Sequence, residues 1–200
     1  ILSAGTITGT QVVCGDEIPN TLNSLTPGQA SGTISYRWES QNLASNPVSD
    51  PWGITPVTTA QYNFTNVVTQ SIRLRRVLIS DLGPGQLCEE ATGFVVITLA
   101  NPPVITFSNL TTTTICAGDT VTFEASVGGV GTFNYYFYIN SGPPAYSVTN
   151  TSSTSIQFDP LKDASYSIGN LDNFWVTVEN SDNCESSSTS ITVSVSPSLP

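Results

Sequence analysis

The chain has 200 residues, enough for one large domain or for two of about 100 residues each. Charged residues make up 10% of the chain, the net charge is −10, and there is one lysine and no histidine or methionine. The scarcity of helix formers argues against a helical bundle. The lack of histidine removes Ser-His-Asp and Cys-His catalytic sites and nearly every zinc site, so we expect neither an enzyme nor a cofactor. The negative charge makes nucleic acid a poor candidate partner.

Small hydroxyl residues dominate the composition, with 26 serines and 27 threonines. This is typical of β-rich extracellular proteins. No stretch reaches the roughly 18 apolar residues of a membrane-spanning helix, so we expect no membrane insertion by this segment. The first residues have no signal-peptide pattern and no starting methionine, and we therefore expect a segment of a longer chain.

Short alternating runs rich in Val, Ile, Thr and aromatic residues predict β-strands along the whole chain. In chain order we expect strands at 6–13, 32–40, 60–66, 71–80, 92–100, 104–115, 120–127, 132–140, 154–158, 173–179 and 188–196. Clusters of Gly, Pro, Asn, Asp and Ser separate these runs. The pattern predicts an all-β fold of two tandem antiparallel Ig-like β-sandwiches.

An internal repeat of roughly 95 residues supports this division. Each copy has an early cysteine, Cys14 or Cys116, and a late one, Cys88 or Cys184. Both late cysteines are followed at the same offsets by apolar residues, which are Val95, Ile97 and Leu99 in the first copy and Ile191, Val193 and Val195 in the second. Four cysteines allow three pairings. We expect Cys14–Cys88 and Cys116–Cys184, the pairing that keeps both bridges within one copy.

Paired prolines, Pro102-Pro103, mark the boundary between the copies. They favour a short extended linker, so the expected domains are 1–101 and 102–200. The expected partners are neighbouring repeats of the same chain, and we expect the 200-residue fragment to be monomeric.

Aromatic alternation predicts which face of each central strand is buried. Trp38 should be a core residue with Tyr36 beside it, whereas Arg37 and Glu39 should face solvent. The basic residues Arg73, Arg75 and Arg76 should form an exposed strand face that pairs with acids such as Glu39.

Two tyrosines of the second copy are candidate sugar-binding residues. The alternation that buries Phe133, Tyr135 and Phe137 leaves Tyr136 and Tyr138 on the outer face. Exposed rings on a flat sheet can stack against sugars, so surface polysaccharide is a candidate partner, although surface aromatics are also ordinary.

The Gly-Asp pairs after the early cysteines, Gly15-Asp16 and Gly118-Asp119, predict turns in which Asp accepts backbone N–H groups. Calcium is the rival interpretation, because Asp and Asn side chains supply oxygen ligands. The candidate ligands are residues such as Asp172, Asn173, Asp182 and Asn183. No segment has the spacing of a calcium loop, so we expect no metal site.

The first copy contains, in chain order, the motifs Cys14-Gly15-Asp16-Glu17, Ser35-Tyr36-Arg37-Trp38-Glu39-Ser40, Trp52-Gly53-Ile54, Arg75-Arg76-Val77 and Cys88. This series resembles the repeats of large cell-surface adhesins of the Bacteroidetes. The second copy resembles the companion PKD-like or Ig-like repeat through Ile115-Cys116-Ala117-Gly118-Asp119 and Tyr135-Tyr136-Phe137-Tyr138-Ile139-Asn140. SprB-type gliding-motility adhesins, which are exported by the type IX secretion system, are the nearest comparison.

The resemblance implies an extracellular, outer-membrane-associated filament that grips a surface while a motor moves it along the cell. Within it, we expect this segment to be a disulfide-clamped spacer. The alternative is a carbohydrate-binding module of an adhesin or of a secreted polysaccharide-degrading enzyme.

Overall fold

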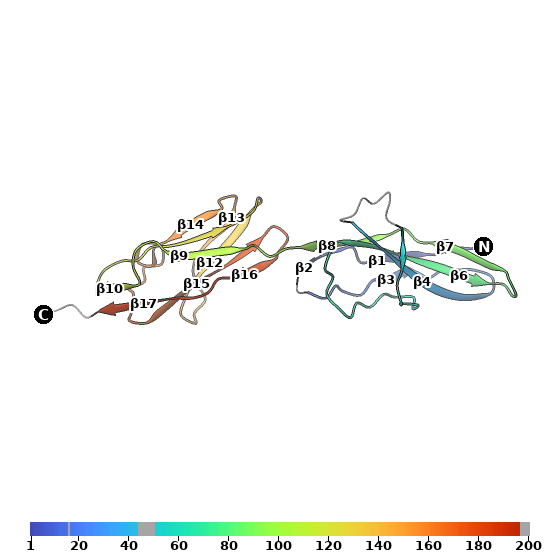
Figure 1. Ribbon diagram of the computed structural model, residues 1–200, viewed down its shortest axis with the longest axis horizontal. Helices are drawn as coiled ribbons and strands as arrows, with labels where there is room; N and C mark the ends of the chain where they lie inside the picture. The colour runs from blue at the N-terminus through green and yellow to red at the C-terminus, as the bar shows by residue number, and fades with distance from the viewer. Residues whose placement is uncertain (16, 44–50, 197–200) are drawn as a thin grey trace. The chain divides into compact units, whose positions relative to one another are not determined.

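The computed structural model describes residues 1–15, 17–43 and 51–196 (Figure 1). The chain forms two compact units, Ile1–Ala100 and Asn101–Pro200. Their boundary lies one residue from the position that the paired prolines indicate. Each unit is described by itself below.

The larger sheet of the first unit is built from β2 (Gln11–Cys14), β4 (Thr33–Asn42), β5 (Gly53–Ile54), β6 (Ile72–Asp81), β7 (Leu87–Ala91) and β8 (Val95–Ala100). The strand order is β2-β8-β6-β4-β5, and β7 pairs with the second half of β6. All pairs are antiparallel except β2 and β8, which run parallel. The central strands β4 and β6 are long because strand-forming residues recur along them, namely Ile, Tyr and Trp in β4 and Ile, Leu and Val in β6.

A smaller layer covers one face of this sheet. It contains β1 (Thr6–Thr8) and β3 (Asn23–Thr26), which pair antiparallel. Trp38 is fully buried between the layers and donates its indole N–H to the Thr59 carbonyl over 2.8 Å. Tyr62 packs edge-on against the Trp38 ring, with centroids 5.3 Å apart. Trp38 is therefore the core residue that the sequence predicts.

The second unit is a sandwich of two sheets. Its larger sheet contains β10 (Thr114–Cys116), β12 (Phe133–Ile139), β13 (Pro144–Thr151), β15 (Asp172–Asn180), β16 (Glu185–Ser187) and β17 (Ile191–Ser196). Its smaller sheet contains β9 (Ile105–Asn109), β11 (Phe123–Val127) and β14 (Ser155–Phe158), in the order β14-β11-β9. Between the sheets lie stacked rings, among them Phe123 and Phe174 with centroids 4.6 Å apart. Strict alternation of buried residues along β12 explains this core.

The two larger sheets have the same topology. The order β10-β17-β15-β12-β13, with β16 paired to β15, matches β2-β8-β6-β4-β5 with β7 paired to β6. The parallel pair also recurs, as β10 beside β17. Trp38 lies opposite Arg76 in the first unit, and Phe137 lies opposite Val176 in the second. When the two sheets are compared, Trp38 therefore corresponds to Phe137, and Arg76 corresponds to Val176.

Some elements differ from the sequence-based expectation. The run 60–66 is not a strand but a loop whose Tyr62 makes one isolated bridge to Leu22, because its apolar residues pack on the core without a ladder. The polar strand β13 was not expected. It forms at the edge of its sheet, where few residues must be buried. A one-turn helix, α1 (Pro160–Ala164), follows the N-cap residue Asp159, whose side chain accepts the N–H groups of Leu161 and Lys162.

Candidate functional site

The disulfide state of the four cysteines differs from the predicted pairing. Cys14 and Cys184 are disulfide-bonded, whereas Cys88 and Cys116 are free thiols on exposed residues. Neither expected bridge, Cys14–Cys88 or Cys116–Cys184, is therefore formed.

The ladders of the first unit explain why its two cysteines do not pair. Cys14 lies beside Ala100, at the last position of β8. Because β8 runs antiparallel to β6, this position lies beyond the Ile72 end of β6. Cys88 pairs instead with Ser80, near the other end of β6. At about 3.3 Å per residue the two cysteines are roughly 30–35 Å apart, and a disulfide needs Cα atoms within about 7 Å.

The second unit repeats this arrangement. Cys116 lies beside Ser196 at the end of β17, beyond the Asp172 end of β15. Cys184 lies at the opposite end of β15, where its carbonyl accepts the N–H of Asn180 over 3.0 Å. Equal offsets after the late cysteines predicted equivalent positions correctly. They carried no information on which cysteines are close in space.

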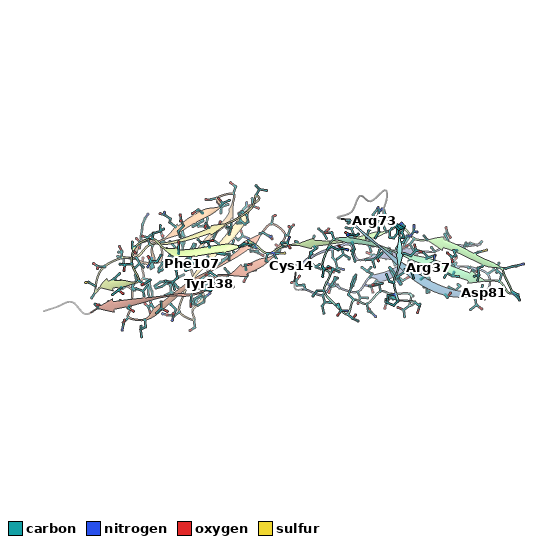
Figure 2. The ribbon with its side chains drawn as sticks, viewed as in Figure 1. Cys14, Arg37, Arg73, Asp81, Phe107 and Tyr138 are labelled. Carbon is teal, nitrogen blue, oxygen red and sulfur yellow. The ribbon has the colours of Figure 1, made fainter. Side chains whose placement is uncertain are left out.

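Each unit thus has a leading end and a trailing end. In the first unit the leading end contains Ile1 and Cys88, which line one surface hollow, and the trailing end contains Cys14 and Ala100. In the second unit the leading end contains Asn101 and Cys184, and the trailing end contains Cys116 and Ser196. Figure 2 labels Cys14 at the trailing end of the first unit and Asp81, next to Ser80, at its leading end. Each chain segment therefore crosses its unit from one end to the other.

The two early cysteines lie in turns of the same kind, one in each unit. The Cys14 N–H donates to the Glu17 carboxylate over 3.1 Å, and the Cys116 N–H donates to the Asp119 carboxylate over 3.0 Å. In return the N–H groups of Glu17 and Asp119 donate to the carbonyls of the two cysteines. The predicted Asp119 turn is confirmed, with Gly118 at φ +93°. In the first unit Glu17 is the acceptor, and Asp16 lies outside the described residues.

The outer face of the first unit, opposite Trp38, carries an ionic network. Glu39 accepts hydrogen bonds from Arg37 over 3.0 Å and from Arg75 over 2.7 Å. Arg37 also makes a bidentate pair with Glu89, with N–O distances of 2.9 and 2.8 Å. The hydrogen bond to Glu89 raises the pKa of Arg37, and the same bond lowers the pKa of Glu89. Arg75 pairs with Glu39 as expected. Glu39 itself is buried rather than solvent-facing, because the two arginines cover it.

Aromatic rings extend this network along the sheet. The guanidinium of Arg75 lies 4.2 Å from the centroid of the Trp52 ring, and that of Arg73 lies 4.9 Å from the Phe94 centroid. Such cation–π contacts hold long side chains against the strands. Figure 2 labels Arg37 and Arg73 on this sheet.

Arg76 does not belong to the exposed basic face that the sequence predicted. Its guanidinium is fully buried beside Trp38 and lies 4.7 Å from the centroid of the Tyr36 ring. Burial lowers its pKa. Its acceptors are the carbonyls of Ala4 at 2.8 Å, Ala60 at 2.9 Å and Thr26 at 3.4 Å, together with the Ser24 hydroxyl at 2.8 Å. Neighbouring residues of a strand point to opposite faces, so Arg75 and Arg76 separate into surface and core.

The outer face of the second unit is aromatic where that of the first is ionic. Tyr138 pairs across the sheet with Trp175, and the two half-buried rings stack with centroids 5.2 Å apart and planes 3° apart. Tyr136, also half-buried, lies two residues earlier on the same face, opposite Thr177. Both candidate tyrosines thus lie on one face. Trp175, which lies on the neighbouring strand β15, completes the aromatic pair.

The oxygens of Asp172 are occupied by donors of the protein. Asn140 donates to one oxygen over 2.8 Å, and Tyr166 and the Gly169 N–H donate to the other over 2.9 and 2.6 Å. Burial by itself raises the pKa of Asp172, but these hydrogen bonds hold its pKa below the ordinary value. Among the described residues, no group of three or more Cys, Asp or Glu side chains is placed to hold a metal ion.

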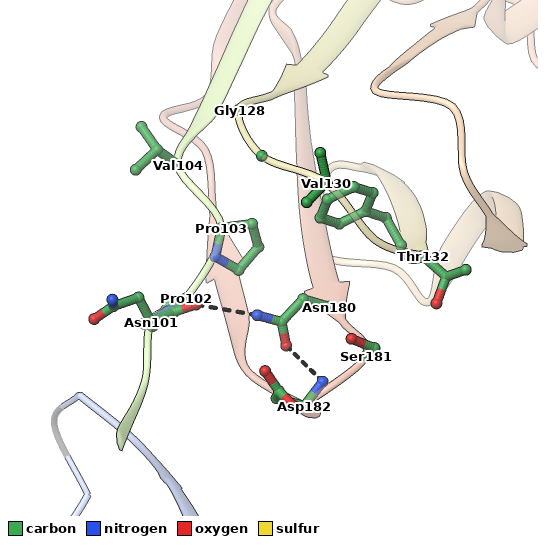
Figure 3. Close-up of a pocket in the computed structure, with 12 residues that line it drawn as sticks. Asn101, Pro102, Pro103, Val104, Gly128, Val130, Thr132, Asn180, Ser181 and Asp182 are labelled. Carbon is green, nitrogen blue, oxygen red and sulfur yellow. Dashed lines mark hydrogen bonds between the residues drawn. The ribbon is translucent and has the colours of Figure 1, made fainter. Parts of the chain in front are cut away.

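A shallow hollow of about 320 Å³ lies at the leading end of the second unit (Figure 3). Pro103 and Val130 line it from two different loops. Asn180 donates from its side chain to the Asn101 carbonyl over 3.0 Å and accepts the Asp182 N–H over 3.0 Å. The same Asn180 amide oxygen accepts the N–H of Cys184. This side chain therefore fixes both the start of the unit and the loop that holds its late cysteine.

Comparison with known proteins identifies the fold. No family model matches the chain, and no curated protein matches it in sequence. A marsupial T cell receptor structure matches over 96% of this chain and 73% of its own, with 14% identity and a TM-score of 0.54. A three-Ig segment of titin matches over 94% of this chain and 63% of its own, with 11% identity and a TM-score of 0.52. The fold is immunoglobulin-like. No helix in the described part of the chain is long and apolar enough to span a membrane.

Proposed function

We propose that this chain is a load-bearing segment of tandem Ig-like repeats in a long cell-surface adhesin. The observation that carries the proposal is the parallel pairing of an early strand with the last strand in each unit.

In the first unit β2 lies early in the chain and β8 ends it. Because the two strands run parallel, pulling the chain ends apart draws β2 and β8 past each other along their length. Four residue pairs, from Gln11–Ile97 to Cys14–Ala100, then resist together rather than opening one at a time. The second unit has the same arrangement over three pairs, from Thr114–Ser194 to Cys116–Ser196.

Two further features favour a cell-surface setting. Disulfide-bonded Cys14 and Cys184 suit an oxidising compartment. The motifs around Trp38 and Arg75 resemble the repeats of SprB-type adhesins. We therefore propose that the segment belongs to an extracellular filament that is used for adhesion and gliding and is exported by type IX secretion.

Single-molecule pulling of the whole 200-residue chain tests the mechanical role. Proline at Val12 or at Val13 removes an N–H group from β2, and alternate N–H groups face β8, so one of the two variants must lose a bond to β8. The matched control is Leu25→Pro in β3, which pairs with β1 and with no other strand of the described residues. We expect a β2 variant to lower the unfolding force of the first unit more than the control does. Equal forces in all three variants would contradict the load-bearing role.

Carbohydrate binding is the second candidate function, favoured by the stacked Tyr138 and Trp175 on an open sheet face. Rings held in this way offer an apolar surface to a sugar ring. A glycan array probed with the wild-type chain and with Trp175→Ala tests it. Binding that the substitution abolishes supports a lectin role, and an array without binding favours the spacer.

A further inference from the structure

Each of the two free thiols lies at one end of its own unit. Cys88 is exposed at the leading end of the first unit, opposite Ser80. Cys116 is exposed at the trailing end of the second unit, beside Ser196. Neither can reach the second cysteine of its own unit, as the ladders above establish.

The matching positions of the other unit are oxidised. Cys184 lies opposite Asn180, the residue that corresponds in register to Ser80, which makes it the counterpart of Cys88. Cys14 and Cys116 each lie in a turn of the same kind, beside the last strand of their own unit, so Cys14 is the counterpart of Cys116. Both Cys184 and Cys14 are disulfide-bonded. Each cysteine position of the repeat is therefore bonded in one unit and free in the other.

We propose that Cys88 and Cys116 are linking cysteines, each of which forms a disulfide with the complementary cysteine of a further Ig-like unit. The partner of Cys116 is a late cysteine at the leading end of another unit, and the partner of Cys88 is an early cysteine at a trailing end. Between two copies of this chain the predicted bond joins Cys116 of one copy to Cys88 of the other. The inference rests on the proposed function only in expecting further units nearby.

The bond forms by thiol–disulfide exchange with a low-molecular-weight disulfide such as oxidised glutathione. The thiolate of one linking cysteine attacks that disulfide and releases one glutathione thiol. The thiolate of the second linking cysteine then displaces the other. Two protein thiols lose two protons and two electrons, one S–S bond forms, and the glutathione disulfide is reduced to two thiols.

Charge opposes the approach of two copies. Glu89 and Glu90 follow Cys88 directly, Asp119 lies in the turn of Cys116, and the whole chain carries a net charge of −10. Screening shortens the range of this repulsion to about 8 Å at 0.15 M salt. Cross-linking is therefore expected to be faster at 0.15 M or higher salt than at 0.01 M.

The test uses Cys88→Ser and Cys116→Ser chains, each alone and mixed in equal amounts, with oxidised glutathione as the oxidant. The mixture offers one Cys116 and one Cys88 on different copies, whereas each single variant offers only like pairs. We expect at least a fivefold excess of disulfide-linked dimer in the mixture, on non-reducing gels, over either variant alone. Peptide mapping should find Cys116 joined to Cys88.

The double variant, Cys88→Ser with Cys116→Ser, is the control and should stay monomeric. Equal dimer from a single variant, dimers linked through Cys14 or Cys184, or a mixture with no more dimer than the double variant would each overturn the proposal. The force measurement above does not use these thiols, so the two results can differ independently.

Discussion

Tyr138 and Trp175 occupy in the second unit the positions that Glu39 and Arg75 occupy in the first. Glu39 pairs across the sheet with Arg75, and Tyr138 pairs with Trp175 at the same register. One pair is held by a 2.7 Å salt bridge and the other by stacking. The outer face of the larger sheet is therefore ionic in the first unit and aromatic in the second.

The burial of Trp38 makes a first stability prediction. Trp38→Ala removes a fully buried ring and its hydrogen bond to Thr59, so we expect it to cost roughly 3–5 kcal/mol of unfolding free energy. Tyr138→Ala, at a half-buried surface position, should cost much less. Urea unfolding of the two variants measures the difference, and equal losses would refute the assignment of faces.

Arg76 should be as sensitive as a core aromatic residue. Arg76→Met leaves the carbonyls of Ala4 and Ala60 without their donor, and each unsatisfied buried group costs about 1–3 kcal/mol. We expect a total loss of roughly 3 kcal/mol or more. Arg73→Met on the outer face is the matched control and should cost under about 1 kcal/mol. Chemical denaturation followed by tryptophan fluorescence compares the two, and a smaller effect at Arg76 would show that its bonds matter little.

Acid stability of the second unit should depend on Asp172. Hydrogen bonds lower its folded-state pKa, so its stabilising contribution is fully present above the unfolded pKa, near 4. That contribution is lost as the pH falls through the lowered folded pKa. We therefore expect Asp172→Asn to be less stable than wild type at pH 7 and the gap to narrow below about pH 4. Melting curves from pH 7 to pH 2 test this, with Asp182→Asn at an exposed loop position as the control. A gap that stays constant with pH would contradict it.

The free state of Cys88 predicts a tolerant position. Its side chain is exposed and makes no bridge, so Cys88→Ser should change the melting temperature of the first unit by less than about 3 °C. Calorimetry of the variant checks this. A drop of 10 °C or more would indicate the Cys14–Cys88 bridge that the sequence first suggested.

The fold class was predictable because buried residues alternate strictly along β12 and over part of β4, β6 and β15. The equivalence of Cys88 and Cys184 was also predictable. Each lies the same number of residues before the last strand of its unit, β8 or β17, and so at the same position in the sheet. Bonding partners were not predictable, because spacing along the chain does not tell which end of a sheet a residue occupies. The strand ladders supply this information, because Cys14 lies beside Ala100 on β8 and Cys88 lies beside Ser80 on β6, at opposite ends of the sheet.

The candidate surface was partly predictable. Tyr136 and Tyr138 follow from period-two alternation, but their neighbour Trp175 lies 37 positions away from Tyr138 and meets it only through the β12–β15 register. Similarly, the sequence Arg75-Arg76 indicates a basic surface patch, whereas the structure places Arg76 on the inner face of the sheet. The signal for α1 was present as Asp159-Pro160, a cap followed by proline at the first helical position.

The buried Arg76 makes the two units unequal in their tolerance of mutation. In the second unit the smaller sheet is held by many interlocking rings, and conservative hydrophobic exchanges in such cores usually cost little. In the first unit one guanidinium joins Ala4, Thr26 and Ala60, three segments with few ladder bonds of their own. Lysine cannot reproduce that planar fork of donors. Sequences descended from this chain can therefore exchange Val176 for another aliphatic residue while position 76 stays arginine, so arginine at that position would mark units of the first kind.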